Sequence, residues 1–403
     1  MSYKILGKSV NRVDAIAKVT GKAKYAEDYF EREMLVGKVL RSTYAHAKIK
    51  NIFIDDALSL DGVEAVITYK DLPNIRFATA GHPYSLDKNH RDVEDRLILT
   101  NKARYVGDAI AAVIAKDEII AQKALKLIKV DYDILDAVFN TEDAIAEGAP
   151  IIHEDKPNNI IASSKIEIGD INEEFKNADY VFEGEYETSI VQHCQLECQN
   201  AYAYVDENNR IVIVTSTQIP HIVRRIVGQA LNIPIGRIRV IKPFVGGGFG
   251  NKQDVIIEPL TAAMTLAVNG RPVRLLLDRE EVFASTRTRH AMKYKIRTAI
   301  SKDGKLLAIS MNNQVNNGAY ASHGHSIAMS AASKFRPLYS FKAIEVKPTT
   351  VYTNLPTAGA MRGYGIPQVC FALESHLDDI AIKLNIDPIK FRENNFISLG
   401  YED

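Results

Sequence analysis

The stretch RIRVIKPFVGGGFGNKQDVIIEPLTAAMTLAV, residues 237–268, contains a strand pattern, a glycine run and a helix pattern in direct succession. Between the strand and the helix, four glycines fill the five positions from Gly246 to Gly250. Backbone N–H groups point outward from such a junction, because no side chain covers them. The pattern predicts a place for a phosphate or an oxyanion; the alternative is a glycine-rich turn that binds nothing.

The spacing of this loop matches neither of the common nucleotide motifs. A phosphate-binding loop of the G-x-x-x-x-G-K-[ST] type requires a serine or threonine after its lysine, whereas Gln253 follows Lys252, and Val245 stands where the first glycine belongs. The dinucleotide motif G-x-G-x-x-G fails as well, because Phe249 or Asn251 occupies a glycine position. ATP and NAD are therefore poor candidates for this loop.

Two further segments carry the same combination of small residues and amides. TSTQIPH, residues 215–221, places Gln218 where a strand pattern gives way to a helix pattern. YTNLPTAGAMRGYGIPQ, residues 352–368, places Arg362 beside small residues and Tyr364 between two glycines, where its ring is expected to be exposed for stacking a planar substrate. We expect the three segments to form one shared site.

Periodicity in residues 18–135 predicts a small α+β domain after a polar lead-in of residues 1–17. The clearest part is residues 100–135, where a strand (108–115), an amphipathic helix (117–128) and a second strand (129–135) follow one another. Mixed strand and helix runs of this kind are typical of an α+β domain.

Residues 136–160 read as a surface linker, with Gly148 and Pro150 as breakers. Residues 161–403 predict a second, larger α+β domain with hairpin turns at 207–209 and 302–304 and with a strand-like pattern that extends over 191–205. Helix patterns cover 220–232, 258–270, 368–386 and 387–395. The last pattern runs almost to residue 403, so we expect that further polypeptide outside this sequence completes the domain.

The composition excludes several classes of protein. Fifty basic and fifty acidic residues give no net charge, which argues against a nucleic-acid or membrane-surface role. The sequence has no run of about 18 apolar residues and no secretory signal pattern, so the cytoplasm is the expected location. Three cysteines cannot hold an iron–sulfur cluster, although Cys194 and Cys198 could share a metal. His323 and His325 alternate in a predicted loop and are a weak metal candidate.

Together with RSTYAHAKI (41–49) and YVGDAIAAVIA (105–115), the three segments resemble the molybdenum-binding subunit of the xanthine dehydrogenase and aldehyde oxidase family, in its bacterial xanthine dehydrogenase form. The likeness covers essentially the whole chain but only the amino-terminal half of that subunit. It implies that residues 18–135 are a hammerhead α/β domain and that 161–403 are the first part of a molybdopterin-binding α+β domain.

The resemblance also implies the cofactor and its contacts. The family holds molybdenum on a dithiolene pterin, with or without a cytosine dinucleotide extension, and the protein supplies no thiolate ligand. Gln218, Phe249 and Arg362 are expected beside the metal. The backbone of Gly247, Gly248, Phe249, Gly250 and Arg362 is expected to approach the metal and the pterin, which side chains would otherwise push away.

By the same resemblance the reaction is a hydroxylation, with oxygen from water, at an electron-poor carbon. Electrons would pass to iron–sulfur clusters on one partner subunit and to FAD on another. The family's glutamate base lies beyond the part that this chain resembles, so we predict no catalytic residue here. A second molybdopterin-binding chain or domain would have to supply it.

Two departures from the family pattern concern the substrate. Purine-oxidising relatives have a glutamate where this chain has Gln253, and an arginine in the segment that here reads AMSAASKF, residues 328–335. Gln253 still donates and accepts hydrogen bonds, and Tyr364 still provides a ring. A purine such as hypoxanthine or xanthine is the expected substrate. The alternatives are nicotinate, an aldehyde, or a scaffold that binds the cofactor without turnover.

Overall fold

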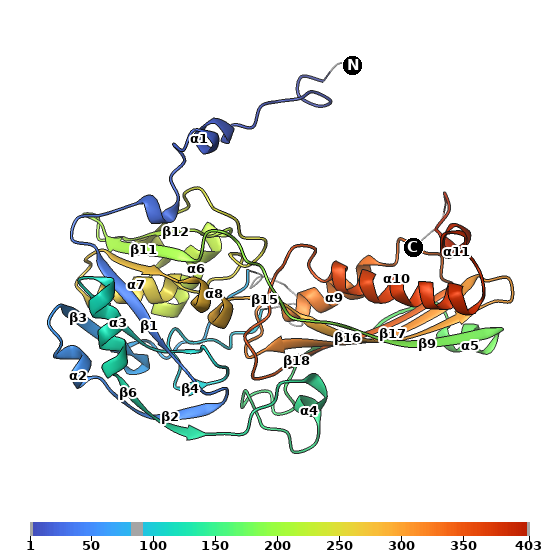
Figure 1. Ribbon diagram of the computed structural model, residues 1–403, viewed down its shortest axis with the longest axis horizontal. Helices are drawn as coiled ribbons and strands as arrows, with labels where there is room; N and C mark the ends of the chain where they lie inside the picture. The colour runs from blue at the N-terminus through green and yellow to red at the C-terminus, as the bar shows by residue number, and fades with distance from the viewer. Residues whose placement is uncertain (1–2, 82–91, 401–403) are drawn as a thin grey trace.

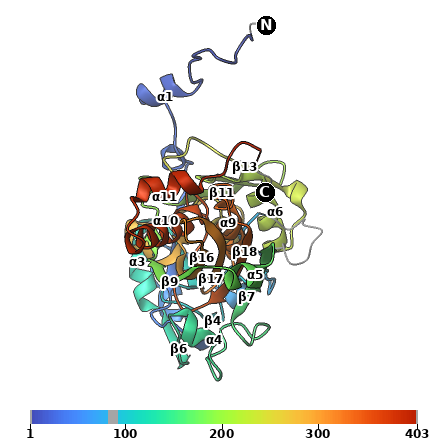
Figure 2. The ribbon, with the colours of Figure 1, turned by 90° about the vertical axis from the view of Figure 1, so that its right-hand side faces the viewer.

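The computed structural model describes residues 3–81 and 92–400. Its body is elongated, with one β-sheet at each end and an amino-terminal arm that projects away from it (Figures 1 and 2). Among the described residues, no helix has both the length and the apolar character needed to cross a bilayer. Helices and strands are mixed throughout the chain, which confirms the predicted α+β class.

The first sheet has seven strands drawn from both predicted domains. In spatial order they are β13 (Ile238–Ile241), β12 (Ile211–Thr215), β11 (Asn200–Val205), β14 (Val273–Leu276), β1 (Leu35–Arg41), β5 (Ala109–Ala115) and β3 (Val63–Thr68). β1 lies parallel to β14, with Leu35 opposite Val273, and antiparallel to β5. Residues 18–135 thus share one continuous sheet with the later part of the chain, which sequence periodicity alone does not reveal.

Helices cover both faces of this sheet. The larger core lies under α6 (Pro220–Leu231) and α7 (Glu258–Ala267), whose apolar side chains pack on the sheet. α3 (Glu118–Leu127) and α2 (Asp55–Leu58) pack on the opposite face near β3 and β5. Every residue of β5 is buried, as its run of alanine, valine and isoleucine favours. A three-stranded sheet, β4 (Lys102–Ala103), β2 (Ala47–Phe53) and β6 (Lys129–Ile134), completes this lobe.

The second sheet forms the other lobe. Its path is β7 (Ile160–Ser163), β18 (Ala343–Tyr352), β17 (Leu306–Gly318), β16 (Ala291–Ile300) and β9 (Tyr180–Thr188), and β8 (Ile166–Ile168) also pairs with β18. Along β16, buried Met292, Tyr294 and Ile296 alternate with outward-facing charged residues. α9 (Gly324–Lys334) and α10 (Ile366–Lys383) cover one face, whereas on the other face α5 (Ile171–Lys176) packs at one end and the middle is open.

The remaining elements are short. They are α1 (Ala15–Val19), α4 (Thr141–Ile145), α5 (Ile171–Lys176), α8 (Arg279–Ser285), α11 (Pro388–Asn395), the paired strands β10 (Val191–Gln192) and β15 (Thr288–Arg289), and the 3-10 turns η1 (Ala26–Asp28), η2 (Tyr69–Asp71) and η4 (Ile235–Arg237). α4 lies inside the segment predicted as a linker and packs on β18 and β17.

Two local predictions are wrong. The strand-like pattern of 191–205 is interrupted, because residues 193–199 form a tight turn between β10 and β11 in which Cys194 is left-handed with φ +51°. His323 and His325 do not alternate in a loop: His323 is the residue before α9, and His325 lies in the first turn of that helix. In both places long-range packing overrides the local pattern.

Candidate functional site

The three glycine- and amide-rich segments converge at one place. The amide N–H of Gly250 donates to Oε1 of Gln218 at 3.1 Å. The backbone N–H of Arg362 donates to the carbonyl of Phe249 at 2.9 Å. Gln218 lies between β12 and α6, Phe249 between β13 and α7, and Arg362 between β18 and α10. The predicted shared position of these residues is therefore present, at the ends of elements from both lobes.

A side chain at either of two loop glycines would make a close contact. A Cβ atom on Gly248 would lie 2.4 Å from Oε1 of Gln218, and one on Gly250 would lie 2.3 Å from the carbonyl oxygen of Ala360. Gly250 also has φ +107°, a conformation that strains any L side chain. Between them Phe249 is itself left-handed, with φ +52°. The loop is thus held in a conformation that turns the Phe249 ring outward, where the residue is half exposed.

Phe249 and Arg362 border an open hollow of about 530 Å³. Its other lining residues are His193, Arg289, Met361, Gly363 and Pro367. Two guanidinium groups therefore face this space, and none of the residues that line it is acidic. Such a set suits a large anionic group that combines charged oxygens with flat apolar surface. The lining residues thus fit the phosphorylated pterin that the resemblance implies.

The basic residues of the hollow are held by backbone contacts. Arg289 donates from Nη2 to the carbonyl of Arg362 at 2.7 Å and from Nη1 to Oε1 of Gln368 at 3.2 Å. Burial lowers the pKa of Arg289. Nε2 of His193 lies 2.7 Å from the carbonyl of Ala360, so that nitrogen carries the proton, and burial lowers the pKa of the ring. His193 is thereby favoured as a neutral donor.

A buried ion pair supports the glycine loop from below. Oε2 of Glu197 accepts from the backbone N–H of Gly246 at 2.7 Å and from Nζ of Lys252 at 2.7 Å. Burial lowers the pKa of Lys252, although Glu197 opposes that shift. One carboxylate therefore joins the first glycine of the loop to the lysine that ends it.

Beneath the same loop, side-chain amides form a network around Asn251. Its Nδ2 donates to Oε1 of Gln192 at 3.0 Å and to Oγ1 of Thr286 at 3.1 Å. Its Oδ1 accepts from Nε2 of Gln199 at 2.8 Å. Asn251 is completely buried, so these bonds satisfy polar atoms that water cannot reach. The network fixes the turn at 193–199 against the loop.

The predicted substrate residues Gln253 and Tyr364 are linked by His323. Nδ1 of His323 lies 2.9 Å from the Tyr364 hydroxyl, and Nε2 lies 3.2 Å from the carbonyl of Gln253. The sequence predicted an exposed ring at Tyr364, but the structure differs. The residue is partly buried against the core of the second lobe, and burial raises the pKa of its hydroxyl to about 12. Packing on α9 accounts for this difference.

An ion pair without solvent exposure joins the loop to the next strand. Asp254 and Arg287 approach to 3.3 Å, and both side chains are completely buried. Asp254 also accepts from the hydroxyl of Ser322 at 2.9 Å. Burial acts to raise the pKa of Asp254, but Arg287 and His323 outweigh it, and the net shift of that pKa is downward. Asp254 is therefore the charged anchor of this region.

Protein side chains alone do not form a metal centre in the described part of the chain. Within residues 3–81 and 92–400, no three histidine, cysteine or acidic side chains gather closely enough to hold an ion. Cys194 is exposed and Cys198 partly exposed, and both are free thiols. Sequence reasoning missed His193, Glu197 and Arg289 as site residues, because distant segments bring them to the loop. The only local signal was an isolated acidic residue in the amide-rich run QLECQ.

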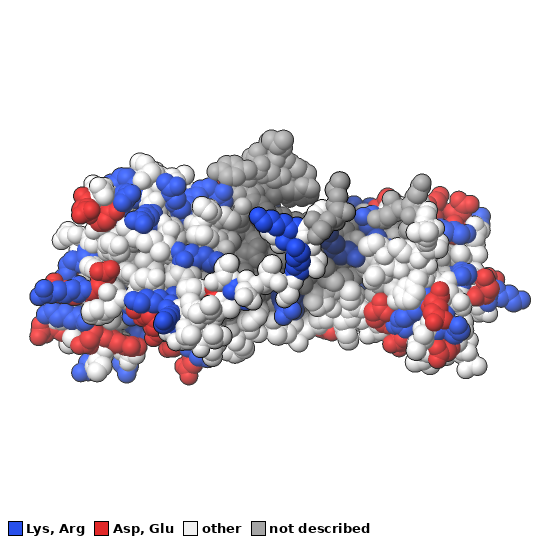
Figure 3. All heavy atoms as spheres, turned by 90° about the horizontal axis from the view of Figure 1, so that it is seen from above, with Lys and Arg blue, Asp and Glu red and all other residues white. Residues whose placement is uncertain are grey.

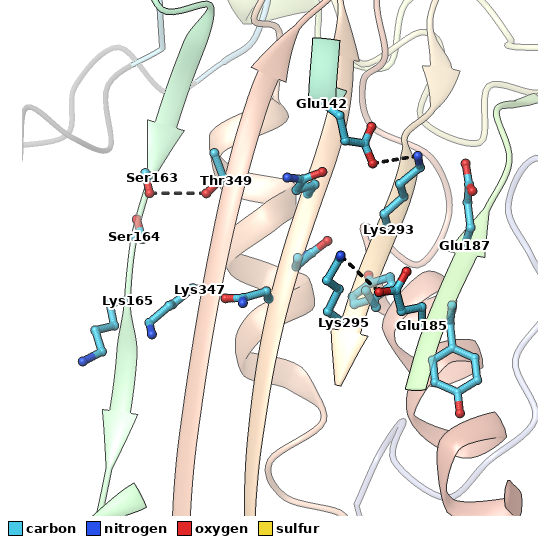
Figure 4. Close-up of a pocket in the computed structure, with 15 residues that line it drawn as sticks. Glu142, Ser163, Ser164, Lys165, Glu185, Glu187, Lys293, Lys295, Lys347 and Thr349 are labelled. Carbon is cyan, nitrogen blue, oxygen red and sulfur yellow. Dashed lines mark hydrogen bonds and ion pairs between the residues drawn. The ribbon is translucent and has the colours of Figure 1, made fainter. Parts of the chain in front are cut away.

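A separate groove of about 820 Å³ crosses the open face of the second sheet. Figure 4 shows two pairs of charged side chains that point toward one another: Lys293 pairs with Glu142 at 2.8 Å and Lys295 with Glu185 at 3.1 Å. None of the predicted site residues lines this groove. We place the candidate site at the smaller hollow, because the left-handed Phe249 of the glycine loop lines it together with Arg289 and Arg362.

Comparisons with known proteins match both regions of the chain. The family model of the molybdopterin cofactor-binding domain matches residues 152–396. The model of the a/b hammerhead domain of aldehyde oxidase and xanthine dehydrogenase matches residues 20–136. A xanthine dehydrogenase molybdenum-binding subunit from Escherichia coli O157:H7 is 48% identical over 384 residues, which are 95% of this chain and 51% of that subunit.

Two other proteins extend the comparison. The nicotinate dehydrogenase large molybdopterin subunit of Eubacterium barkeri is 34% identical, and the match covers 99% of this chain and 91% of that subunit. The solved aldehyde oxidoreductase of Desulfovibrio gigas superposes with a TM-score of 0.91 at 30% identity, over 97% of this chain and 43% of that one. This chain thus spans about half of the Escherichia coli subunit and nearly all of the Eubacterium subunit.

The family models together reach across nearly the whole chain, and the site geometry lies within the part that the cofactor-binding model matches. The chain therefore belongs to the xanthine dehydrogenase and aldehyde oxidase family of molybdenum-dependent oxidoreductases.

Proposed function

We propose that this chain is the amino-terminal half of the catalytic subunit of a molybdenum hydroxylase that oxidises a purine such as hypoxanthine or xanthine. The observation that carries the proposal is the convergence of Gln218, Phe249 and Arg362 through the glycine loop, where Phe249 and Arg362 line one open, basic hollow. The 48% identity to a xanthine dehydrogenase molybdenum-binding subunit supports the purine.

The cofactor would be held mainly by backbone and amide groups. The backbone of Gly247, Gly248, Phe249, Gly250 and Arg362 and the side chain of Gln218 would contact a molybdenum pterin, with or without a cytosine dinucleotide. When bound, the cofactor supplies a metal that hydroxylates carbon with oxygen from water and accepts two electrons. The Gly250 N–H holds the Gln218 side chain in place, so the Gln218 amide would not have to move when the cofactor binds.

This chain's contribution to substrate binding would come from Gln253 and Tyr364. His323 holds both, through the Tyr364 hydroxyl and the Gln253 carbonyl. The Gln253 side chain would form hydrogen bonds with ring nitrogens or carbonyls of a purine, and the Tyr364 ring would limit where a flat substrate lies. Because glutamine carries no charge, it would bind the ring without changing the ring's protonation.

A second polypeptide would complete the active site. The match covers 51% of the Escherichia coli relative, so about half of such a subunit has no counterpart here. That half would provide the glutamate base, and separate iron–sulfur and FAD subunits would carry the electrons away in the cytoplasm. The basic hollow is open to solvent in this chain, which supports a partner that covers it.

Nicotinate is the second candidate substrate. The relative that this chain matches over 91% of its length is a nicotinate dehydrogenase subunit, and two arginines face the hollow where a carboxylate could bind. An aromatic aldehyde and a cofactor-binding scaffold without turnover are the remaining alternatives.

The test is to purify this chain in complex with the companion polypeptide that matches the other half of the relatives. Molybdenum and pterin are measured per chain, and turnover is assayed with hypoxanthine, xanthine, nicotinate and benzaldehyde. One molybdenum per complex and fastest turnover of a purine support the proposal. Fastest turnover of nicotinate selects the second candidate. Bound cofactor with no turnover of any substrate selects the scaffold, and a complex without molybdenum refutes all three.

A further inference from the structure

The amino-terminal arm, residues 3–22, presents apolar side chains to solvent. Six of them are between 65% and 102% exposed: Ile5, Leu6, Val10, Val13, Ile16 and Val19. No residue of α1 within this arm is buried. Isolated exposed apolar residues are common on proteins, but six within fifteen positions of an extended segment expose far more apolar surface than a stable monomer usually leaves.

The arm makes its own local hydrogen bonds and few contacts with the body. Lys8 N–H donates to Ile5 and Thr20 N–H to Ile16, both within the arm. Residues 3–22 form no hydrogen bond with the described part of the body. One cation–π contact joins them to it, with Nζ of Lys18 5.5 Å from the centre of the Phe244 ring. Figures 1 and 2 both show the arm standing clear of the two lobes. The fold of the body therefore does not account for the arm's apolar residues.

The arm is anchored at the glycine loop. Phe244 N–H donates to the carbonyl of Lys24 at 3.2 Å, and the rings of Tyr25 and Phe244 lie 6.3 Å apart. Phe244 stands two positions before Gly246, the first glycine of the loop. The arm therefore leaves the body beside the segment that leads into the glycine loop.

The arm is also strongly basic in a chain with no net charge. Residues 3–24 contain six basic residues, Lys4, Lys8, Arg12, Lys18, Lys22 and Lys24, and one acidic residue, Asp14. Seen from above in Figure 3, acidic side chains gather at the two ends of the molecule, while basic side chains occupy the middle of this face. A partner for this surface needs an apolar groove with acidic residues at its edges.

We infer that the arm is a docking element for the companion polypeptide that completes the cofactor site. The inference rests on the proposed function and adds the surface by which the second chain is held. Three observations carry it together: the exposed apolar arm, its anchor at the glycine loop, and a chain that spans 51% of the Escherichia coli subunit. The arm would lie across the companion, which would bury its apolar side chains and pair with its lysines.

The experiment measures the affinity of this chain for the companion polypeptide that matches the other half of the relatives. The test variant is Ile5→Ser/Val10→Ser/Val13→Ser. The matched control is Ile119→Ser/Ile389→Ser, which removes apolar side chains of similar exposure, 65% and 69%, from the body. Since these three side chains are mostly exposed and the arm has no hydrogen bond to the described part of the body, the thermal midpoint of the isolated chain should change little in the test variant.

We expect the arm variant to bind the companion at least roughly tenfold more weakly, because three apolar side chains would no longer be buried. The control should bind like the wild type. A second variant, Lys4→Gln/Lys8→Gln/Arg12→Gln, should weaken binding at low salt and reduce its salt dependence. Equal affinities of wild type and arm variant would overturn the inference while leaving the proposed function intact.

Other binding partners of the arm would give different results in these measurements. If the wild-type chain alone self-associates at micromolar concentration and the arm variant does not, the arm binds a second copy and the inference is wrong. It is equally wrong if the arm directs binding to phosphatidylserine vesicles while affinity for the companion is unchanged. If the wild type binds neither companion nor molybdenum, the proposed function fails, and the inference fails with it.

Discussion

At the scale of single residues, Gly248 sets the position of the Gln218 amide. A Cβ atom at position 248 would lie 2.4 Å from Oε1 of Gln218, which is the far end of a flexible side chain. The side chain can therefore move away at little cost in folding energy. Doing so would break its 3.1 Å bond from the Gly250 N–H and displace the amide from the glycine loop.

We therefore predict that Gly248→Ala lowers the turnover of the assembled enzyme by roughly a hundredfold, since misplacement of a group by about 1 Å has effects of this size. The urea midpoint of the chain should change little. Gly236→Ala is the matched control, because a Cβ there meets nothing within 4 Å. Unchanged turnover in Gly248→Ala would show that Gln218 does not act at the metal.

Gly250 differs from Gly248, because its close neighbour is backbone. A Cβ there would lie 2.3 Å from the carbonyl oxygen of Ala360, and φ is +107°. We predict that Gly250→Ala destabilises the chain by about 3 kcal/mol, from strain and overpacking together. Gly148→Ala, with φ +80° and open space around it, should cost only about 1 kcal/mol. Urea denaturation of the two variants separates them, and equal losses would contradict the close contact.

The residue scale also shows what the sequence could reveal about the site. The glycines of the loop, Gln218 and Arg362 stand out because small residues and amides at strand ends are unusual in themselves. Arg289 and Glu197 carry no such mark: Arg289 reaches the hollow through a bond to the Arg362 carbonyl, and Glu197 reaches the loop from 49 positions before Gly246. Contacts of this range depend on the whole fold, so no local pattern encodes them.

At the scale of elements, local patterns predict helices and turns well. The helix predicted for 117–128 is α3, and those predicted for 220–232 and 258–270 are α6 and α7. Each is amphipathic or carries a proline in its first turn, and these signals lie within the segment itself. The parallel pairing of β1 with β14 has no such signal, because it joins Leu35 to Val273 across most of the chain. Sheet partners were therefore the least predictable part of the fold.

The buried pair of Asp254 and Arg287 joins the glycine-loop segment to the segment that enters β15. Both side chains are without solvent exposure, and Asp254 also accepts from Ser322 next to α9. We predict that Arg287→Leu lowers the free energy of unfolding by about 4 kcal/mol, because it leaves a buried carboxylate without its cation. Adding Asp254→Asn should recover part of the loss, since the orphaned charge is then gone.

The control for this pair lies on the open face of the second sheet. Lys295 and Glu185 form an ion pair in which both side chains are largely exposed, so Lys295→Leu should leave the urea midpoint unchanged. If the urea midpoint of Arg287→Leu were also unchanged, the ion pair of Asp254 and Arg287 would not stabilise the contact between these elements. A double variant no more stable than Arg287→Leu would locate the loss in packing instead of charge.

At the scale of the whole molecule, the seven-stranded sheet makes the two predicted domains structurally inseparable. β1, β5 and β3 continue the sheet that β11, β12 and β14 begin, and one core under α6 and α7 draws on strands from both regions. The second lobe joins this unit where Arg362 and Gln218 meet the glycine loop. The candidate site therefore lies where both lobes meet, and a structural change in either lobe would alter its geometry.

Stability should depend on pH through buried histidines. Burial lowers the pKa of His153 to about 3, and its ring lies 4.5 Å from that of Tyr352, with Nε2 bonded to the carbonyl of Ala319 at 2.8 Å. Because the folded pKa is below the unfolded value near 6.5, only the unfolded chain takes up a proton as the pH falls from 6.5 toward 3. This one group therefore lowers the free energy of unfolding by about 1.4 kcal/mol for each pH unit in that window.

His153→Phe keeps the aromatic contact and removes the titration. Buried Asp95, whose pKa burial raises to about 6, acts in the opposite direction, so the total slope of the wild type mixes both signs. The difference between wild type and variant isolates His153: the variant should start less stable at pH 7, through loss of the bond to Ala319, and the two stabilities should converge by about 1.4 kcal/mol per unit from pH 6 to pH 5. Urea midpoints measured at half-unit steps decide the matter, and parallel curves for His153→Phe would mean that this ring is protonated in the folded chain.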